Sequence, residues 1–341
     1  MRKFLIGLLV VLVALAGAFY YFSDPDISRA TLEAKYATAP SQFITIDYPP
    51  TDAANGVPSK PYSTRVHIRD VGPRDAPAIV LIHGSNASLF TWEPWAKRLS
   101  DKFRVVSLDL PAHGLTGAVP SNDYSQKGMV EFVKDVTDKL GLKKFALAGN
   151  SMGGGVAARF AEIYPDSLTQ LILVDAGGMP LKKQGDRVPL VFTLARMPVL
   201  NQVLLHITPR SLAEEGLNKA IVRKEIINDA MIDTYWELAR MEGTRAATGL
   251  RFQLPWDLYV SEHIRDIKAP TLILWGDQDG LIPVDAAHEF NKAIPGSKLI
   301  VYKNVGHIPM EEVADQSAAD VRAFLTAAPP EQTNKDDSSS Y

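Results

Sequence analysis

The sequence contains no cysteine among its 341 residues. Without thiols the chain can form no disulfide, no thiolate metal site and no cysteine-based nucleophile. It also lacks an excess of positive charge, because 36 basic and 39 acidic residues give a formal net charge of -3. A chain with this balance has no general attraction for a polyanion, so we expect no nucleic acid partner. Any nucleophilic chemistry must depend on another residue type.

The first 22 residues differ from the rest of the chain. Charged residues are absent from Phe4 to Phe22, directly after Arg2 and Lys3. An apolar run of this kind behind a positive start predicts a membrane anchor or a secretory signal segment at residues 1–22. We favour the uncleaved anchor, because Phe19 to Phe22 form an aromatic cluster suited to the far membrane interface. In both interpretations Arg2 and Lys3 stay on the cytoplasmic side. The rest would be exported to the periplasm or the outside, anchored or secreted.

From residue 43 onward, short β-rich runs alternate with longer amphipathic stretches, which is the pattern of a mostly parallel sheet covered by helices. Several runs are apolar without alternation, as strands buried on both faces are. We expect eight strands, at residues 43–48, 64–69, 78–82, 104–108, 144–148, 171–174, 271–275 and 298–302.

The interval between the sixth and seventh runs is much longer than the others. Apolar residues three and four apart at residues 190–205 and 220–241 predict helices there, which we interpret as a cap inserted after strand six. Residues 328–341 are rich in Pro, Ser, Asp and Lys and predict a disordered tail. The expected division is a connector at 23–42, a core at 43–176 and 265–327, and a helical cap at 177–264.

The strongest chemical signal is the segment Gly149-Asn150-Ser151-Met152-Gly153. It follows the apolar run 145–148 and precedes a helix-like stretch at 154–163, so a strand, a tight turn and a helix meet at the serine. Small residues on both sides let neighbouring segments approach such a strained turn. The sequence therefore predicts Ser151 as a nucleophile.

A serine hydroxyl is a weak nucleophile at neutral pH, so it needs a nearby base and an acid that orients the base. Enzymes with this strand-to-helix turn place the acid and then the base later in the chain. His307 directly follows the last expected strand and is the predicted base. Asp277 and Asp279 share the loop after the seventh run, and both are candidates for the acid.

The oxyanion of a tetrahedral intermediate needs preorganised donors. One is expected to be the backbone N-H of Met152, immediately after the nucleophile. The other is expected from the loop His83-Gly84-Ser85-Asn86 after the third run, as the N-H of Ser85.

Five segments together resemble the α/β-hydrolase family over residues 43–326. The resemblance implies the α/β-hydrolase fold, with an eight-stranded, mostly parallel sheet flanked by helices. It is similar to the capped members that need no metal or organic cofactor. The usual place of the family's acid, third after the glycine of the Trp-Gly loop, points to Asp279. The segments are His83-Gly84, Asp109-Leu110-Pro111-Ala112-His113-Gly114, Gly149 to Gly153, Trp275-Gly276-Asp277-Gln278-Asp279 and Gly306-His307-Ile308-Pro309.

The resemblance narrows the expected activity. Dehalogenases and epoxide hydrolases of this family have aspartate at the turn, whereas Ser151 favours acyl chemistry. We therefore expect a serine hydrolase, an esterase or lipase, that cleaves a carboxylic ester of a small or lipid-like substrate through an acyl-enzyme.

Two alternatives remain. The same residues suit an acyltransferase or a hydrolase of carbon-carbon bonds in dienoic keto acids, although Ile308 stands where those hydrolases commonly carry Trp. Ala112 also departs from the family's usual glycine. A non-catalytic binding protein that retains the fold is the third hypothesis. Oligomeric state and physiological substrate are not predicted.

Overall fold

The computed structural model describes residues 23–49, 60–179, 206–254 and 262–327, with scattered residues between 4 and 20. The predicted membrane segment at 1–22 is thus mostly outside the described residues. The tail at 328–341 and the predicted helix at 190–205 lie wholly outside them. No helix within the described residues has the length and hydropathy that a membrane crossing requires.

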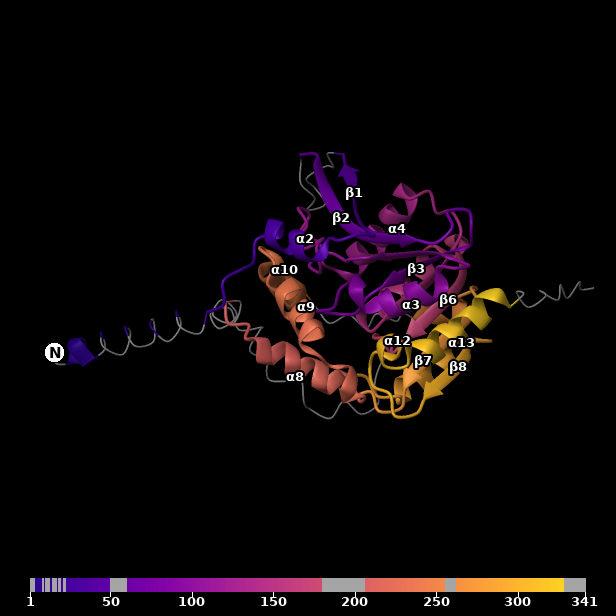
Figure 1. The fold of residues 1–341 in the computed structure, drawn as a ribbon. Helices are drawn as coiled ribbons and strands as arrows, with labels where there is room; N and C mark the ends of the chain where they lie inside the picture. Colours follow the sequence, from indigo (N-terminus) through magenta and orange to yellow (C-terminus); the bar gives the residue numbers. More distant parts are fainter. Residues whose placement is uncertain are drawn as a thin grey trace, which may run out of the picture.

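The centre of the molecule is one eight-stranded sheet with the order β1-β2-β4-β3-β5-β6-β7-β8 (Figure 1). β1 and β2 are antiparallel to each other, β2 is antiparallel to β4, and the remaining pairs are parallel. The predicted mostly parallel sheet is confirmed. The strands are β1 Ser41–Tyr48, β2 Tyr62–Val71, β3 Ala78–Ile82, β4 Arg104–Leu108, β5 Phe145–Asn150, β6 Leu168–Val174, β7 Thr271–Gly276 and β8 Lys298–Tyr302.

Helices cover both faces of this sheet. From residue 23 onward, the α-helices that the structure describes outside the insertion are α2 Arg29–Tyr36, α3 Glu93–Leu99, α4 Gln126–Lys139, α5 Met152–Ile163, α11 Asp285–Ala293, α12 Pro309–Glu312 and α13 Ala314–Thr326. Short 3-10 turns occur at η2 Leu89–Trp92, η3 Pro165–Ser167, η4 Lys224–Ile226 and η5 Glu262–Asp266. Local chemistry sets some helix starts, as at α4, where the Ser125 hydroxyl accepts the N-H of Gly128 at 3.0 Å.

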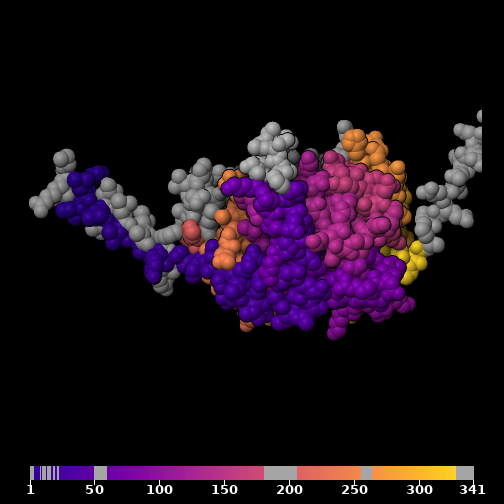
Figure 2. All heavy atoms as spheres, turned by 90° about the horizontal axis from the view of Figure 1, so that it is seen from above, coloured from indigo at the N-terminus to yellow at the C-terminus, as the bar shows by residue number. Residues whose placement is uncertain are grey.

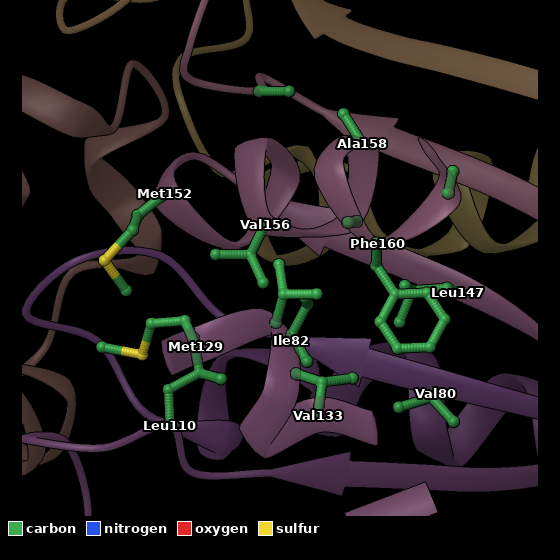
Figure 3. Close-up of a cluster of buried hydrophobic side chains, with 14 of the residues drawn as sticks. Val80, Ile82, Leu110, Met129, Val133, Leu147, Met152, Val156, Ala158 and Phe160 are labelled. Carbon is green, nitrogen blue, oxygen red and sulfur yellow. The ribbon is translucent and has the colours of Figure 1, made fainter. Parts of the chain in front are cut away.

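The apolar core has two halves, one on each face of the sheet. Alternate residues of a strand point to opposite faces, so Val80 and Ile82 of β3 join the half under α4 and α5. Ile79 and Leu81 of the same strand join the half under α3 and α13. Figure 3 shows part of the first half, with side chains of α4, α5, β3 and β5 packed together. Burial of the central strands on both faces explains their continuous apolar sequences.

The insertion between β6 and β7 contains α8 Arg210–Ala220, α9 Asp229–Ala239 and α10 Thr244–Gln253. The predicted helical stretch at 220–241 is interrupted before α9. At the interruption the Glu312 carboxylate accepts the backbone N-H groups of Val222 and Arg223 at 2.8 and 2.9 Å. These bonds replace intrahelical ones, so a side chain from α12 stabilises the break.

The segment before β1 packs against the insertion. Ile27 donates its N-H to the Arg240 carbonyl at 2.8 Å and accepts from the N-H of Glu242 at 2.9 Å. Figure 1 shows α2 beside α9 and α10, and in Figure 2 indigo atoms of this segment border orange atoms of the cap. Residues 23–36 therefore form part of the folded domain.

Candidate active site

Ser151 occupies the sharp turn between β5 and α5. Its backbone angles, φ 54° and ψ -120°, are strained for a residue with a side chain, and such positions cost about 1–3 kcal/mol. Two hydrogen bonds hold the turn: Ser151 donates its N-H to Val174 at 3.1 Å, and its carbonyl accepts the N-H of Gly177 at 2.7 Å. These bonds to the end of β6 and the residues after it fix Ser151 at the N-terminus of α5.

Two glycines allow the chain to close around this turn. A Cβ at Gly84 would lie 2.9 Å from the Ser151 Cβ, and a Cβ at Gly153 would lie 2.5 Å from the backbone oxygens of Ile82 and His83. Neither position has room for a side chain. The loop after β3 therefore lies directly against the serine and the first turn of α5.

The predicted base and acid are in contact. His307 Nδ1 lies 2.7 Å from Asp279 Oδ2. The other carboxylate oxygen of Asp279 accepts the backbone N-H groups of Leu281 and Ile282 at 2.7 and 3.0 Å. Because the carboxylate accepts the Nδ1 proton, Nε2 is left as the unprotonated nitrogen that a general base needs. The imidazole is 6% exposed and the Asp279 carboxylate is fully buried.

Asp277, the other candidate acid, has a different position. Its Oδ1 accepts the N-H of Asn304 at 2.8 Å, and its Oδ2 lies 3.6 Å from the Lys303 ammonium. These contacts shape the turn between β7 and the His307 loop. The structure therefore brings Asp279 to the imidazole and keeps Asp277 away from it.

The residue before the serine ties the two parts of the site together. The Asn150 side-chain amide donates to the carbonyls of His307 and Val174 at 3.0 and 3.1 Å. Among the described residues, no hydrogen bond joins the Ser151 hydroxyl to the His307 ring. Such bonds are often loose in unliganded sites and tighten when substrate binds.

The predicted oxyanion donors lie on both sides of the serine. Met152 is the first residue of α5, where the backbone N-H has no partner inside the helix. Ser85 follows Gly84 in the facing loop. Arg251 in α10 was not predicted from the sequence. It donates to the Ser85 hydroxyl at 2.8 Å and approaches the Met152 sulfur at 3.5 Å. A cation of the insertion thus contacts both predicted oxyanion residues.

A buried histidine supports the oxyanion loop. His83 Nε2 accepts the N-H of Leu110 at 3.0 Å, which leaves the ring proton on Nδ1 to be donated to the Gly84 carbonyl at 2.7 Å. Burial lowers the pKa of His83, so the ring remains neutral at physiological pH. Its role is to hold the backbone of the loop.

A small cavity lies beside this loop, between the core and the cap. Asn86 and His113 line it from the core, and Tyr235 and Thr248 line it from α9 and α10. His113 Nε2 is buried and has no hydrogen-bond partner in the part of the chain that the structure describes. Neither Ser151 nor His307 lines this cavity.

A second group of serine, histidine and aspartate joins β1, β2 and the loop after β4. We call Ser41, His67 and Asp109 the strand set, and Ser151, His307 and Asp279 the elbow set. In the strand set, His67 Nε2 lies 2.9 Å from the Ser41 hydroxyl and Nδ1 lies 2.7 Å from Asp109. Asp109 also accepts the N-H groups of Leu89 and Leu115 at 2.7 and 2.8 Å. Its side chain and that of His67 are fully buried.

A third carboxylate, Asp175, adjoins the elbow set. Oxygen and nitrogen atoms of Asp175, Asp279 and His307 all lie within 4.8 Å of one another, a spacing that also suits a metal ion. However, His307 and two backbone N-H groups already occupy the oxygens of Asp279. Sequence reasoning missed Asp175, although it directly follows the buried run 171–174.

The chain has similar proteins of several kinds. It is 30% identical over 272 residues to an uncharacterised protein of Mycobacterium tuberculosis, covering 74% of this chain and 76% of that protein. It is 28% identical over 274 residues to 2-hydroxy-6-oxononadienedioate/2-hydroxy-6-oxononatrienedioate hydrolase of Klebsiella pneumoniae, covering 77% and 92%.

A solved structure of a bacterial membrane phospholipase A is 25% identical with a TM-score of 0.67, and the alignment covers 95% of this chain and 98% of that one. A family model described as the alpha/beta hydrolase fold matches residues 77–313, which include the serine turn and the His307 loop. This chain therefore belongs to the alpha/beta hydrolase family.

Proposed function

We propose that this protein is a serine hydrolase that cleaves carboxylic esters, with Ser151 as nucleophile, His307 as general base and Asp279 as the orienting acid. The observation that carries the proposal is the strained Ser151 turn beside the His307-Asp279 hydrogen bond of 2.7 Å. A nucleophile forced onto a helix start, next to an imidazole fixed in one tautomer, is the arrangement that acyl transfer requires.

In the proposed reaction the Ser151 oxygen attacks the ester carbonyl while its proton passes to His307 Nε2. The N-H groups of Met152 and Ser85 stabilise the oxyanion. His307 then gives its proton to the departing alcohol, which leaves an acyl group on Ser151. Water, deprotonated by His307, attacks the acyl-enzyme and releases the acid.

We further propose lipid-like esters as the substrate class and a catalytic domain that is anchored to a membrane and exported. The apolar segment at 1–22 and the likeness of nearly the whole chain to a membrane phospholipase A support this assignment. Fractionation of cells tests the location, because a protein that starts near Phe19 and is free of membranes would contradict the anchor.

The activity is tested by turnover of a p-nitrophenyl ester series by the wild type and by Ser151→Ala. The variant is expected to lose a factor of about 10⁶ in kcat and to keep its fold, because a triad without its nucleophile loses nearly all of its rate enhancement. Unchanged turnover in the folded variant would remove Ser151 from the mechanism.

Carbon-carbon bond hydrolysis is the second candidate, because the Klebsiella relative is a hydrolase of a dienoic keto acid. A dienoic keto acid is therefore assayed beside short-chain and long-chain esters. Our proposal expects kcat/KM to be higher for the esters. A higher value for the keto acid would make carbon-carbon cleavage the preferred reaction.

A further inference from the structure

Asp175 is a fully buried carboxyl group at the carboxyl end of β6, where its backbone has a positive φ of 44°. One of its oxygens, Oδ1, accepts the N-H of Gly276 at 3.0 Å. The other, Oδ2, is buried and has no donor among the described residues. An ionised carboxylate in this position would be strongly destabilised, because buried charges need a compensating partner.

The titratable groups around Asp175 supply no such partner. Asp279 comes from the β7 loop, His307 from the β8 loop, Glu312 from α12 and Tyr302 from the end of β8. Three of these are acids. The one base, His307, donates its Nδ1 proton to Asp279. The surroundings of Asp175 are therefore short of positive charge.

The hydrogen bonds show which of the two aspartates holds a proton. Asp279 accepts three, from Leu281, Ile282 and His307, and these favour its ionised form. Asp175 accepts one, from Gly276. Burial is the main cause that raises the pKa of Asp175 well above its usual range, and the nearby Asp279 charge raises it further. The proton of the pair belongs on Asp175.

We propose that Asp175 is a neutral positioning residue that donates the Oδ2 proton to the Asp279 carboxylate and so sets the basicity of His307 in the proposed hydrolase. The donated hydrogen bond disperses the negative charge of Asp279. A less concentrated charge stabilises the protonated imidazole less, so His307 releases its proton at lower pH. This role rests on the proposed function, in which His307 is the base.

Two variants separate the neutral donor from an ionised carboxylate. Asp175→Asn keeps the shape, a donor and the lack of charge, so the pH profile of kcat/KM is expected to stay within about 0.3 pH unit of the wild type. Asp175→Ala removes the donor, so the acidic limb of the profile is expected to move to higher pH by roughly one pH unit. The free energy of a hydrogen bond to a charged group corresponds to a pKa shift of about this size. Urea unfolding checks that both variants fold.

If Asp175 is ionised instead, Asp175→Asn removes a negative charge near His307, and the acidic limb moves to lower pH. That result overturns the proposal, as does an Asp175→Ala profile that coincides with the wild type. A retained structure with the limb unmoved in Asp175→Asn and raised in Asp175→Ala supports it.

An infrared difference spectrum between the wild type and Asp175→Asn at neutral pH tests the protonation without any substrate. The proposal expects the wild type to show a protonated carboxylic acid band that the variant lacks. Absence of this band shows that Asp175 is ionised and overturns the proposal. If the band is present in a protein that hydrolyses no ester, the result supports a neutral Asp175 and refutes the proposed function.

Discussion

The elbow set and the strand set contain the same three residue types in different surroundings. The strand set has both links of a triad, with His67 2.9 Å from the Ser41 hydroxyl and 2.7 Å from Asp109. The elbow set has only the histidine-aspartate link, at 2.7 Å. By side-chain distances alone, the strand set is the better triad.

The backbone surroundings of the two serines favour the elbow set instead. Ser41 is the first residue of a regular strand, and its hydroxyl also accepts a hydrogen bond from Arg69 at 3.1 Å. His67 lies fully buried against the rings of Phe43 and Phe90. Ser151, in contrast, lies in a strained turn at the N-terminus of α5, and Gly84 of the facing loop packs against its side chain. The comparison leads us to expect that the backbone geometry around a serine, more than its two side-chain partners, decides its reactivity.

The largest expected contrast is in covalent labelling by a fluorophosphonate. The probe should modify Ser151 completely, because the proposed oxyanion donors, the N-H groups of Met152 and Ser85, would lie beside it. It should leave Ser41 unmodified. Peptide mass spectrometry of the wild type, Ser151→Ala and Ser41→Ala measures the result, with Ser41→Ala as the matched control. An adduct on Ser41 in Ser151→Ala would make the strand set reactive, and no label in the wild type would favour a non-catalytic binding protein.

Substitution of Asp279 should change the turnover, whereas substitution of Asp109 should change the stability. Asp279→Asn is expected to lower kcat by about 10⁴ with little effect on stability, because the imidazole loses its tautomer. Asp109→Ala should lower the free energy of unfolding by about 3 kcal/mol or more, because three buried N-H groups lose their acceptor. Ester turnover and urea unfolding of both variants provide the measurements. A stable Asp109→Ala protein would show that the strand set is not structural.

The smallest expected effect is on the pH dependence of stability. Burial alone would raise the pKa of Asp109, but the adjacent His67, His83 and the backbone N-H of Leu89 leave it below its usual value. An acid with a lowered pKa stabilises the fold above its unfolded value, and this stabilisation is lost as pH falls through the folded value. The stability advantage of the wild type over Asp109→Asn should thus shrink below about pH 4. Urea unfolding at several pH values tests this, and a constant difference would contradict it.

Much of the fold could be predicted because buried parallel strands have a recognisable sequence. The run at 271–275 is apolar after Thr271 and becomes β7, buried on both faces. The second strand in the sheet order, β2, is longer than the sequence pattern predicts. Its observed bounds, Tyr62–Val71, extend beyond the predicted 64–69 at both ends. Pairing with β1 extends the strand back to Tyr62, and pairing with β4 extends it forward to Val71.

The site was less accessible to sequence reasoning where tertiary contacts decide. Asp277 and Asp279 have the same side chain in one loop, and only the path of the turn brings one of them to His307. The contact between Ser41 and His67 comes from antiparallel pairing of β1 and β2, which local pattern does not specify. Asp175 was missed because a lone aspartate after a strand also fits an ordinary turn.

The contact between Arg251 and the oxyanion loop couples two events that are usually considered separately. Because α10 belongs to the insertion after β6, any movement of α10 away from the loop after β3 would also withdraw the guanidinium from Ser85 and Met152. Substrate entry and the contact of Arg251 with the proposed oxyanion residues would then both depend on the position of α10. Catalytic speed and the size of the admitted molecule would consequently be difficult to alter independently by mutation in α10.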